Sequence, residues 1–303
     1  MRVLITGAAG CLGQVLVPTL LADSRITMVI GHDIRTLPLK HPRLQFLQGD
    51  IRDPALGEAV RDADAVIHMA FVVIESQLGR ERANRGLAHA INLGGINTIL
   101  AALRTSTKLI HLSSASVYGT SPVPLTESAP LRPLPGFGYA HDKVQVEERL
   151  IKAEAQGLNC LRLRPHIILG PHAQPFLRGV LRLPFYPRLA DPAPKLQVVH
   201  EQDVVAAILA GLFSDATGAI NLASKDSLSF QEMQRACHWI TIGVRPEIAK
   251  AWAAWAFRYL GIGPDPAWGA GLDQPLLLDC TRAHTLLKWQ PRFPRVIDVL
   301  RHF

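Results

Sequence analysis

Near its N-terminus the chain carries the glycine-rich segment TGAAGCLG, residues 6–13, directly after the apolar run RVLIT. A short β-branched run that ends at glycine predicts a buried strand, and the residues after Gly13 have the apolar spacing of a helix. Glycine permits a tight turn and a close approach of the backbone to a pyrophosphate, which the N–H groups of a helix N-terminus can bind. This arrangement therefore predicts a dinucleotide-binding domain.

Apolar runs and helix-like segments alternate through the first half of the chain. We expect strands at residues 2–6, 26–33, 44–50, 64–70, 108–114 and 159–165, with helices around 55–61, 81–104 and 139–156. Such alternation is typical of a parallel sheet with helices on both faces. The expected fold class is α/β: a doubly wound parallel sheet (Rossmann) over residues 1–165, with a small C-terminal substrate domain over 166–303.

After Pro165 the sequence is rich in proline and arginine and has no clear period. Helices are expected near 202–212, 229–240, 247–260 and 294–302, with a strand near AINLA, and one strand and one helix could return to the main sheet. Trp252, Trp255 and Tyr259 recur at helical spacing, so we expect them to form a stripe that faces the core. An exposed stripe would instead allow weak contact with a membrane surface.

The composition narrows the classes of partner and compartment. The 303 residues carry a net charge of +7 without a basic run or a nucleic-acid motif, so we expect a small-molecule substrate and no nucleic acid. The first residues lack the apolar stretch of a signal peptide, which favours a cytoplasmic protein. Four widely separated cysteines without a CxxC pair indicate that no metal is bound.

An acidic residue is expected about 20 residues after the glycine loop, at the end of the second strand. Asp33, in the segment VIGHDIR, lies at this position. A carboxylate there accepts hydrogen bonds from the adenosine ribose hydroxyls and repels a 2′-phosphate, which favours NAD. Arg35 could accept that phosphate, so NADP is not excluded.

The segment GYAHDKVQVEERL, residues 138–150, places Tyr139 four residues before Lys143. This spacing puts both side chains on one face of a helix. A free phenol has a pKa of about 10 and is a poor base at neutral pH, whereas a neighbouring ammonium favours the phenolate. Tyr139 could then exchange a proton with an alcohol or carbonyl. Upstream, the strand end HLSSASVYG carries Ser113, Ser114 and Ser116, and a hydroxyl there can hydrogen-bond the reacting oxygen.

Together these segments resemble the extended branch of the short-chain dehydrogenase/reductase family, which contains nucleotide-sugar epimerases and hydroxysteroid dehydrogenases. The likeness covers nearly the whole chain through TGAAGCLG, Asp33, GDIRD (49–53), DAVIHMA (64–70), NLGGIN (92–97), SSASVYG (113–119), YAHDK (139–143), RPHIILGP (164–171), VVHEQDVVAAI (198–208) and LLKWQP (286–291). It implies an NAD-dependent enzyme and a homodimer formed through the helices near 81–104 and 139–156.

The resemblance also assigns roles to individual residues. It implies that Ser114, Tyr139 and Lys143 are catalytic, and that Asn92 holds a proton-relay water. The residues it implies for cofactor binding follow the loop and the strand ends: Gly7, Gly10, Cys11, Leu12, Gly13, Asp33, Arg35, Asp50, Ile51, Met69, Ala70, Lys143, Pro165 and His166. By contrast, His68 and His111 lie inside strand patterns and are interpreted as core histidines.

The sequence constrains the identity of the substrate less than that of the cofactor. The loop SSASVYG lacks the carboxylate of the family's dehydratases, which disfavours sugar dehydration. Epimerases usually have asparagine before GP, where this chain has Ile167, and RPHIILGP is instead similar to hydroxysteroid dehydrogenases through His166. Candidates for substrate contact are Phe71, Ser116, Ile167, Phe176 and Arg178.

We therefore expect NAD-dependent hydride transfer at a secondary alcohol or ketone, with a preference for an apolar, sterol-like substrate. Two alternatives stay open: a nucleotide-sugar 4-epimerase, and a non-catalytic protein that senses NAD(P). Six basic residues between 161 and 195 are compatible with a phosphorylated substrate, because arginine suits bidentate contacts with phosphate.

Overall fold

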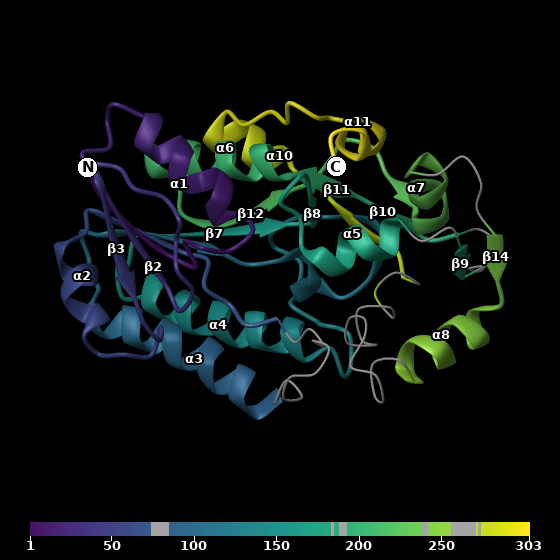
Figure 1. Ribbon diagram of the computed structural model, residues 1–303, viewed down its shortest axis with the longest axis horizontal. Coiled ribbons are helices and arrows are strands. Elements are labelled where there is room, and N and C mark those ends of the chain that lie inside the picture. Colours follow the sequence, from purple (N-terminus) through teal and green to yellow (C-terminus); the bar gives the residue numbers. More distant parts are fainter. Residues whose placement is uncertain (74–84, 183–184, 188–192, 238–241, 256–270, 272–273) are drawn as a thin grey trace.

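The computed structural model of the chain, shown in Figure 1, describes residues 1–73, 85–182, 185–187, 193–237, 242–255, 271 and 274–303. Its largest element is a seven-stranded sheet in the order β12-β7-β5-β4-β1-β2-β3, in which every neighbouring pair is parallel. The strands are β1 (Arg2–Thr6), β2 (Met28–Asp33), β3 (Leu44–Gln48), β4 (Ala65–His68), β5 (Lys108–Leu112), β7 (Cys160–Pro165) and β12 (Gly218–Leu222).

Helices cover both faces of this sheet (Figure 1). One face carries α1 (Gly13–Ala22), α6 (Glu201–Leu212) and α10 (Thr281–Leu287), and the other carries α2 (Leu56–Asp62), α3 (Arg85–Ala102) and α4 (Gly138–Glu154). The expected doubly wound parallel sheet is confirmed. Helix α10 has no counterpart among the helices expected from the sequence.

Strand β1 contributes side chains to both hydrophobic cores, one on each face of the sheet. Val3, Leu4 and Ile5 are each 0% exposed, and their side chains alternate between the faces. Val3 and Ile5 pack in the cluster beneath α1 and α6, whereas Leu4 packs in the cluster beneath α2, α3 and α4. A strand buried on both faces has a continuous apolar sequence, which explains the run RVLIT.

The smaller part of the molecule is built from short strands. A four-stranded sheet, β13-β10-β15-β6, uses β6 (Ser121–Leu125), β10 (Lys195–Leu196), β13 (Leu228–Ser229) and β15 (Leu276–Leu278), and two pairs join β8 (Ile167–Leu169) to β11 (Val198–His200) and β9 (Phe185–Pro187) to β14 (Ile242–Val244). The remaining helices are η1 (Ala115–Tyr118), α5 (Pro175–Leu181), α7 (Phe230–Cys237), α8 (Pro246–Trp255) and α11 (Val296–Arg301).

Chain segments cross between the two parts in both directions. Strand β6 precedes Pro165 in the sequence but pairs with β15 in the smaller sheet. Strand β12 lies after Pro165 but completes the main sheet beside β7, and α6 packs against β5 and β7. The two parts are therefore tied together by more than one covalent connection.

The expectation that the aromatic stripe faces the core is wrong for its described members. Trp252 is 67% exposed and Trp255 is 47% exposed, and their rings meet edge to face with centroids 5.8 Å apart. Helix α8 packs on β9, a strand of three residues in a two-stranded sheet. Tyr259 lies outside the described residues. Among the described helices, none combines the length and the apolar character needed to cross a bilayer.

Leu150 of α4 provides a test of the second core. Its side chain is 0% exposed in the cluster with Leu4, whereas Leu286 of α10 is 43% exposed. We expect Leu150→Ala to lower the free energy of unfolding by about 2–5 kcal/mol, because it leaves a cavity in a close-packed interior. The chemically identical change Leu286→Ala is expected to cost much less. Urea denaturation of both variants measures the difference, and equal losses would contradict this packing.

Candidate active site

In the loop between β1 and α1, three glycines allow other backbone atoms to approach closely. Gly7 has φ +77°, and a Cβ atom added there would lie 2.8 Å from the Ala70 nitrogen. A Cβ at Gly10 would lie 2.9 Å from the Gly7 oxygen, and one at Gly13 would overlap the Ala8 carbonyl. Each of the three positions therefore requires glycine, and this cradle at the start of α1 fits a pyrophosphate.

Cys11 and Leu12, the other loop residues expected at the cofactor, lie between Gly10 and Gly13. Leu12 is the N-cap residue of α1 and makes no side-chain cap hydrogen bond. The N-terminal N–H groups of α1 thus have no side-chain competitor from the cap position, as anion binding at a helix N-terminus requires.

Asp33 ends β2 beside this loop and is 6% exposed. Its Oδ2 accepts a hydrogen bond from the Ala9 N–H at 3.0 Å, and its Oδ1 accepts from the Arg35 N–H at 3.0 Å. The Arg35 side chain is 62% exposed and lies 3.4 Å from Asp33 through Nε. The acidic residue and the arginine that argue for different cofactors are thus in contact.

The next cofactor positions follow β3 and β4. Asp50 forms two side-chain bonds with Arg52, at 2.9 and 2.6 Å, and these hydrogen bonds lower the pKa of its carboxyl to about 2. Ile51 is buried against Gly95 of α3. The backbone N–H of Met69 donates to the Thr6 oxygen at 3.1 Å, which holds the segment Met69–Ala70 beside the glycine loop.

Ser114 and Tyr139 meet at the end of β5. Ser114 is the N-cap residue of η1, and its Oγ accepts from the Ser116 N–H at 3.2 Å and from the Ser116 hydroxyl at 2.9 Å. The Ser114 side chain also hydrogen-bonds the phenol of Tyr139, the second residue of α4. Two hydroxyls from segments well separated in the sequence therefore converge on one point.

Lys143 lies one helical turn after Tyr139 and is 3% exposed. Its Nζ donates to the Leu112 oxygen at 2.6 Å and lies 3.7 Å from the centre of the Phe71 ring. The Phe71 ring stands edge-on to the Tyr139 ring with centroids 5.4 Å apart, and Phe137 lies 5.7 Å from Tyr139 on another side. Aromatic rings thus surround the phenol and the ammonium.

Burial dominates the titration of this pair. It raises the pKa of Tyr139 to about 12 despite the hydrogen bond with Ser114, which lowers it. Burial also lowers the pKa of Lys143 to about 7, against the charges of Glu147 and Asp142, which raise it. Desolvation is thus the largest influence on both groups, and the ammonium of Lys143 is bound to the Leu112 carbonyl.

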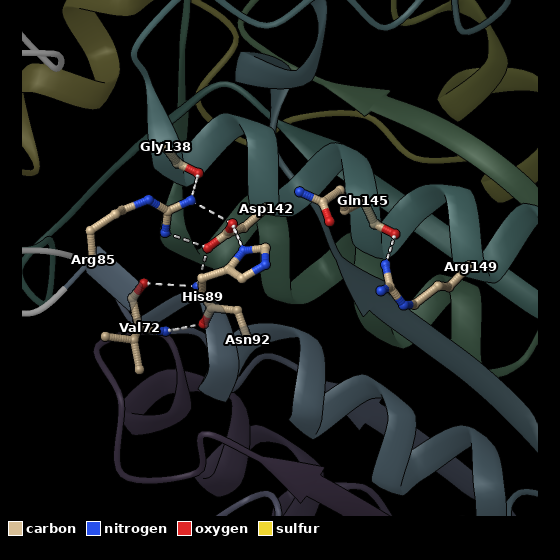
Figure 2. A network of polar contacts seen from close by, with 8 residues as sticks. All are labelled: Val72, Arg85, His89, Asn92, Gly138, Asp142, Gln145 and Arg149. Carbon is tan, nitrogen blue, oxygen red and sulfur yellow. Dashed lines mark hydrogen bonds and ion pairs between the residues drawn. The ribbon is translucent and has the colours of Figure 1, made fainter. Parts of the chain in front are cut away.

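Beside Lys143 lies a carboxylate that no sequence pattern singled out. Asp142 is 0% exposed and is bound by Arg85, His89 and Asn92, which reach it from α3 (Figure 2). A signal for this cluster does exist, because 85, 89 and 92 share one face of a helix. This spacing identifies the cluster only when the buried carboxylate that the three side chains bind is already known.

Asn92, expected to hold a proton-relay water, makes three hydrogen bonds within the protein. Its Oδ1 accepts from the Val72 N–H at 2.7 Å, and its amide nitrogen donates to the Val72 oxygen at 3.2 Å and to Asp142 at 3.0 Å. The side chain is 2% exposed. Asn92 thus joins the segment after β4 to both α3 and α4.

His166, which follows Pro165 at the end of β7, uses both ring nitrogens within the protein. Nε2 contacts the Leu276 oxygen at 3.1 Å, and Nδ1 accepts from the Ile167 N–H at 2.8 Å. Burial lowers its pKa to about 4, so the ring is neutral at physiological pH. The other substrate candidates Phe176 and Arg178 lie on α5, where Arg178 donates to the Pro171 oxygen.

Two further histidines lie beneath Lys143. His68 and His111 occupy paired positions on β4 and β5, are each 1% exposed, and have ring centroids 5.2 Å apart. Burial lowers the pKa of both rings, and the nearby charge of Lys143 lowers it further. They are neutral residues of the sheet interior, as interpreted from the sequence. No group of three potential metal ligands occurs among the described residues.

Comparisons with known proteins bear on this geometry. The model of the NAD dependent epimerase/dehydratase family matches residues 3–221. An uncharacterized protein of Mycobacterium tuberculosis is 26% identical, over 97% of this chain and 81% of its own length. A UDP-glucose 4-epimerase of Lactobacillus helveticus is 24% identical, over 99% and 95% of the two chains.

One relative that is named for a different activity matches a shorter region. It is the 4-hydroxy-2-methyl-3-oxo-4-farnesyl-3,4-dihydroquinoline-1-oxide ketoreductase of Stigmatella aurantiaca, 29% identical over 58% of this chain and 53% of its own. Among solved structures, the complex of the Thermus thermophilus UDP-glucose 4-epimerase with NAD superposes with a TM-score of 0.77 at 22% identity, covering 100% of this chain and 97% of that chain. The likeness to that structure concerns the fold.

Gly13 gives a test of the loop. We expect Gly13→Ala to lower folding stability by about 1–3 kcal/mol, because the new Cβ overlaps the Ala8 carbonyl. Binding of NAD should weaken about tenfold or more, which calorimetry measures. Gly179→Ala is the matched control, since a Cβ at Gly179 meets nothing within 4 Å. A Gly13→Ala protein that binds NAD like the wild type would rule out this cradle as the dinucleotide site.

Proposed function

The chain belongs to the NAD dependent epimerase/dehydratase family, and on that premise we propose that it is an NAD-dependent oxidoreductase acting on a secondary alcohol or ketone of an apolar substrate. The observation that carries the proposal is the hydrogen-bonded pair of Ser114 and Tyr139, which lies beside Lys143 and is walled by Phe71 and Phe137.

The chain would hold the cofactor through the three loop glycines, Asp33 and the segment Met69–Ala70. The Asp33 carboxyl group is buried beside the loop, which supports NAD over a cofactor with a 2′-phosphate. A bound nicotinamide ring supplies the hydride acceptor for oxidation and the hydride donor for reduction. The rest of the chemistry belongs to side chains of the protein.

For alcohol oxidation, the phenolate of Tyr139 takes the hydroxyl proton as the C–H hydride leaves. Ser114 donates a hydrogen bond to the reacting oxygen and fixes its position. The ammonium of Lys143 stabilises the phenolate by its charge. For ketone reduction, Tyr139 gives its proton to the developing alkoxide. Because burial raises the Tyr139 pKa to about 12, the phenolate population and the oxidation rate increase with pH.

The apolar preference rests on the surroundings of the phenol. Phe71 covers the Lys143 ammonium at 3.7 Å and meets Tyr139 edge-on, so one side of the reaction centre offers carbon and no hydrogen-bonding group. A polyhydroxylated sugar would leave its hydroxyls unpaired against such a wall. The Stigmatella aurantiaca relative, named as the ketoreductase of a farnesyl-bearing ring, supports an apolar substrate.

The second candidate is a nucleotide-sugar 4-epimerase, favoured by the relative of Lactobacillus helveticus that matches over almost the full length of both chains. An epimerase oxidises and re-reduces the same carbon, so it accumulates no NADH. A sensor without turnover is less well supported, because Ser114, Tyr139 and Lys143 are all present and Ser114 contacts Tyr139.

Substrate panels separate these candidates. We expect the purified protein with NAD to form NADH from apolar cyclic secondary alcohols, including sterols, with conversion followed by absorbance and by mass spectrometry of the ketone. UDP- and dTDP-sugars serve as the competing panel. Isomerised sugar without accumulation of NADH would overturn the dehydrogenase proposal in favour of the epimerase.

Tyr139→Phe tests the acid/base group. We expect kcat to fall about 10²- to 10⁴-fold, because the ring is kept while the proton-transferring oxygen is lost. Tyr118→Phe is the matched control: Tyr118 is 3% exposed and its hydroxyl is bonded to Asn221 and Arg164, so the same oxygen is removed from a packing position. We expect this control to retain most of its activity. Full activity in Tyr139→Phe would refute the proposed chemistry.

A further inference from the structure

The buried carboxylate of Asp142 has an unusually complete set of donors. Arg85 donates through Nη1 to Oδ2 at 2.6 Å and through Nη2 to Oδ1 at 2.5 Å. The His89 Nδ1 lies 2.7 Å from Oδ1, and Asn92 donates to Oδ2 at 3.0 Å. Figure 2 shows all three side chains converging on Asp142 from the neighbouring helix.

These contacts connect α3 to the two segments that carry Tyr139 and Phe71. Arg85 also donates to the oxygen of Gly138 at 2.5 Å, so it holds the first residue of α4, next to Tyr139. Asn92 binds both the N–H and the oxygen of Val72, the residue after Phe71. A single carboxylate therefore connects α3, the first turn of α4 and the segment that places Phe71 over Lys143.

The cluster keeps Asp142 ionised although it is 0% exposed. Burial acts to raise its pKa, but the hydrogen bonds from Arg85, His89 and Asn92 outweigh burial, and the pKa is lowered. A buried carboxylate is stable only when donors of this kind compensate its lost hydration. Arg85 and His89 are 39% and 42% exposed, so their own polar groups remain partly hydrated.

Resting on the proposed function, we propose that Asp142 is a positioning residue for this reaction. Its carboxylate, held by Arg85, His89 and Asn92, fixes the first turn of α4 so that Tyr139 meets Ser114. It also places a buried negative charge directly beside Lys143 in the chain.

The charge of Asp142 matters because few groups of the described residues face Lys143. From α4 these are Tyr139, Asp142 and Glu147, and from the sheet they are the neutral rings of His68 and His111. Glu147 is itself bound by Ser113 and Arg164, with Arg162 3.8 Å away. The nearby arginines offset the charge of Glu147, as Arg85 partly offsets that of Asp142 from the helix surface.

Removing the charge of Asp142 is expected to lower the pKa of Lys143. Asp142 and Glu147 raise the pKa of Lys143 against burial, which brings it to about 7. Without the Asp142 charge the lysine loses its proton at a lower pH. At pH values between the lowered pKa and the wild-type pKa of about 7, the amine is neutral in the variant but charged in the wild type, so over that range it no longer favours the phenolate of Tyr139 and alcohol oxidation slows.

The test uses Asp142→Asn in the full chain, with Glu148→Gln, an exposed carboxylate on the same helix, as the control. For Asp142→Asn we expect kcat for oxidation to fall about tenfold at neutral pH with KM little changed, and the midpoint of the Lys143 titration in the kcat–pH profile to fall by about one pH unit. The control should match the wild type. A fall in kcat at every pH without movement of the midpoint would refute the electrostatic role of Asp142.

Arg85→Lys tests the positioning role separately. Lysine keeps the charge but cannot make the paired contacts with Asp142 and the bond to Gly138. We expect kcat to fall while the midpoint stays where it is in the wild type, because Asp142 remains ionised. Wild-type kcat in a folded Arg85→Lys protein would overturn the positioning role, and this variant decides the question if Asp142→Asn does not fold.

A readout without substrate distinguishes the role of Asp142 from the proposed function. NMR of protein labelled with ¹³C-lysine follows the titration of Lys143, whose resonance is assigned with Lys143→Met. We expect a pKa near the wild-type value of about 7 in Glu148→Gln and a lower pKa in Asp142→Asn. A lowered pKa together with no turnover of any alcohol would reject the proposed function alone, and an unchanged pKa would reject the role of Asp142.

Discussion

The parallel pairing of the seven main strands is the constraint on which the site depends. Because every strand runs the same way, the carboxyl ends of β1, β2, β4, β5 and β7 open at one edge of the sheet. The glycine loop, Asp33, the segment 69–70, Ser114 and His166 therefore lie along one edge although they come from distant parts of the chain. Ligands of such sheets bind outside this edge.

Desolvation is the second force that shapes the site. The helices that cover the sheet bury Lys143, and burial disfavours its charged form as it disfavours the phenolate of Tyr139. Burial thus disfavours the ion pair of phenolate and ammonium that the proposed reaction uses. Buried carboxylates on the same helix act in the opposite direction on Lys143, and they require donors of their own, which α3 and β7 supply.

The aromatic wall and the polar cluster belong to one arrangement. Phe71 contacts Lys143 on one side, and the backbone of its neighbour Val72 is bound by Asn92, which in turn donates to Asp142. The segment that carries the Phe71 ring is therefore held by hydrogen bonds to α3 and, through Asn92, to α4. The proposed preference for an apolar substrate and the placement of the proposed acid/base pair depend on the same few contacts.

What the sequence determined by itself was local. The period of apolar residues predicted the strands and helices of the main sheet, and fixed spacings identified the glycine loop, Asp33 and the pair Tyr139–Lys143, because backbone geometry relates such residues over one turn or one strand. The tertiary structure alone decided how far burial moves each pKa, the exposure of Trp252 and Trp255, and the partners of Asn92 and Asp142. Those properties arise from contacts between segments distant in the chain, and no local period or spacing encodes which helix will pack against which.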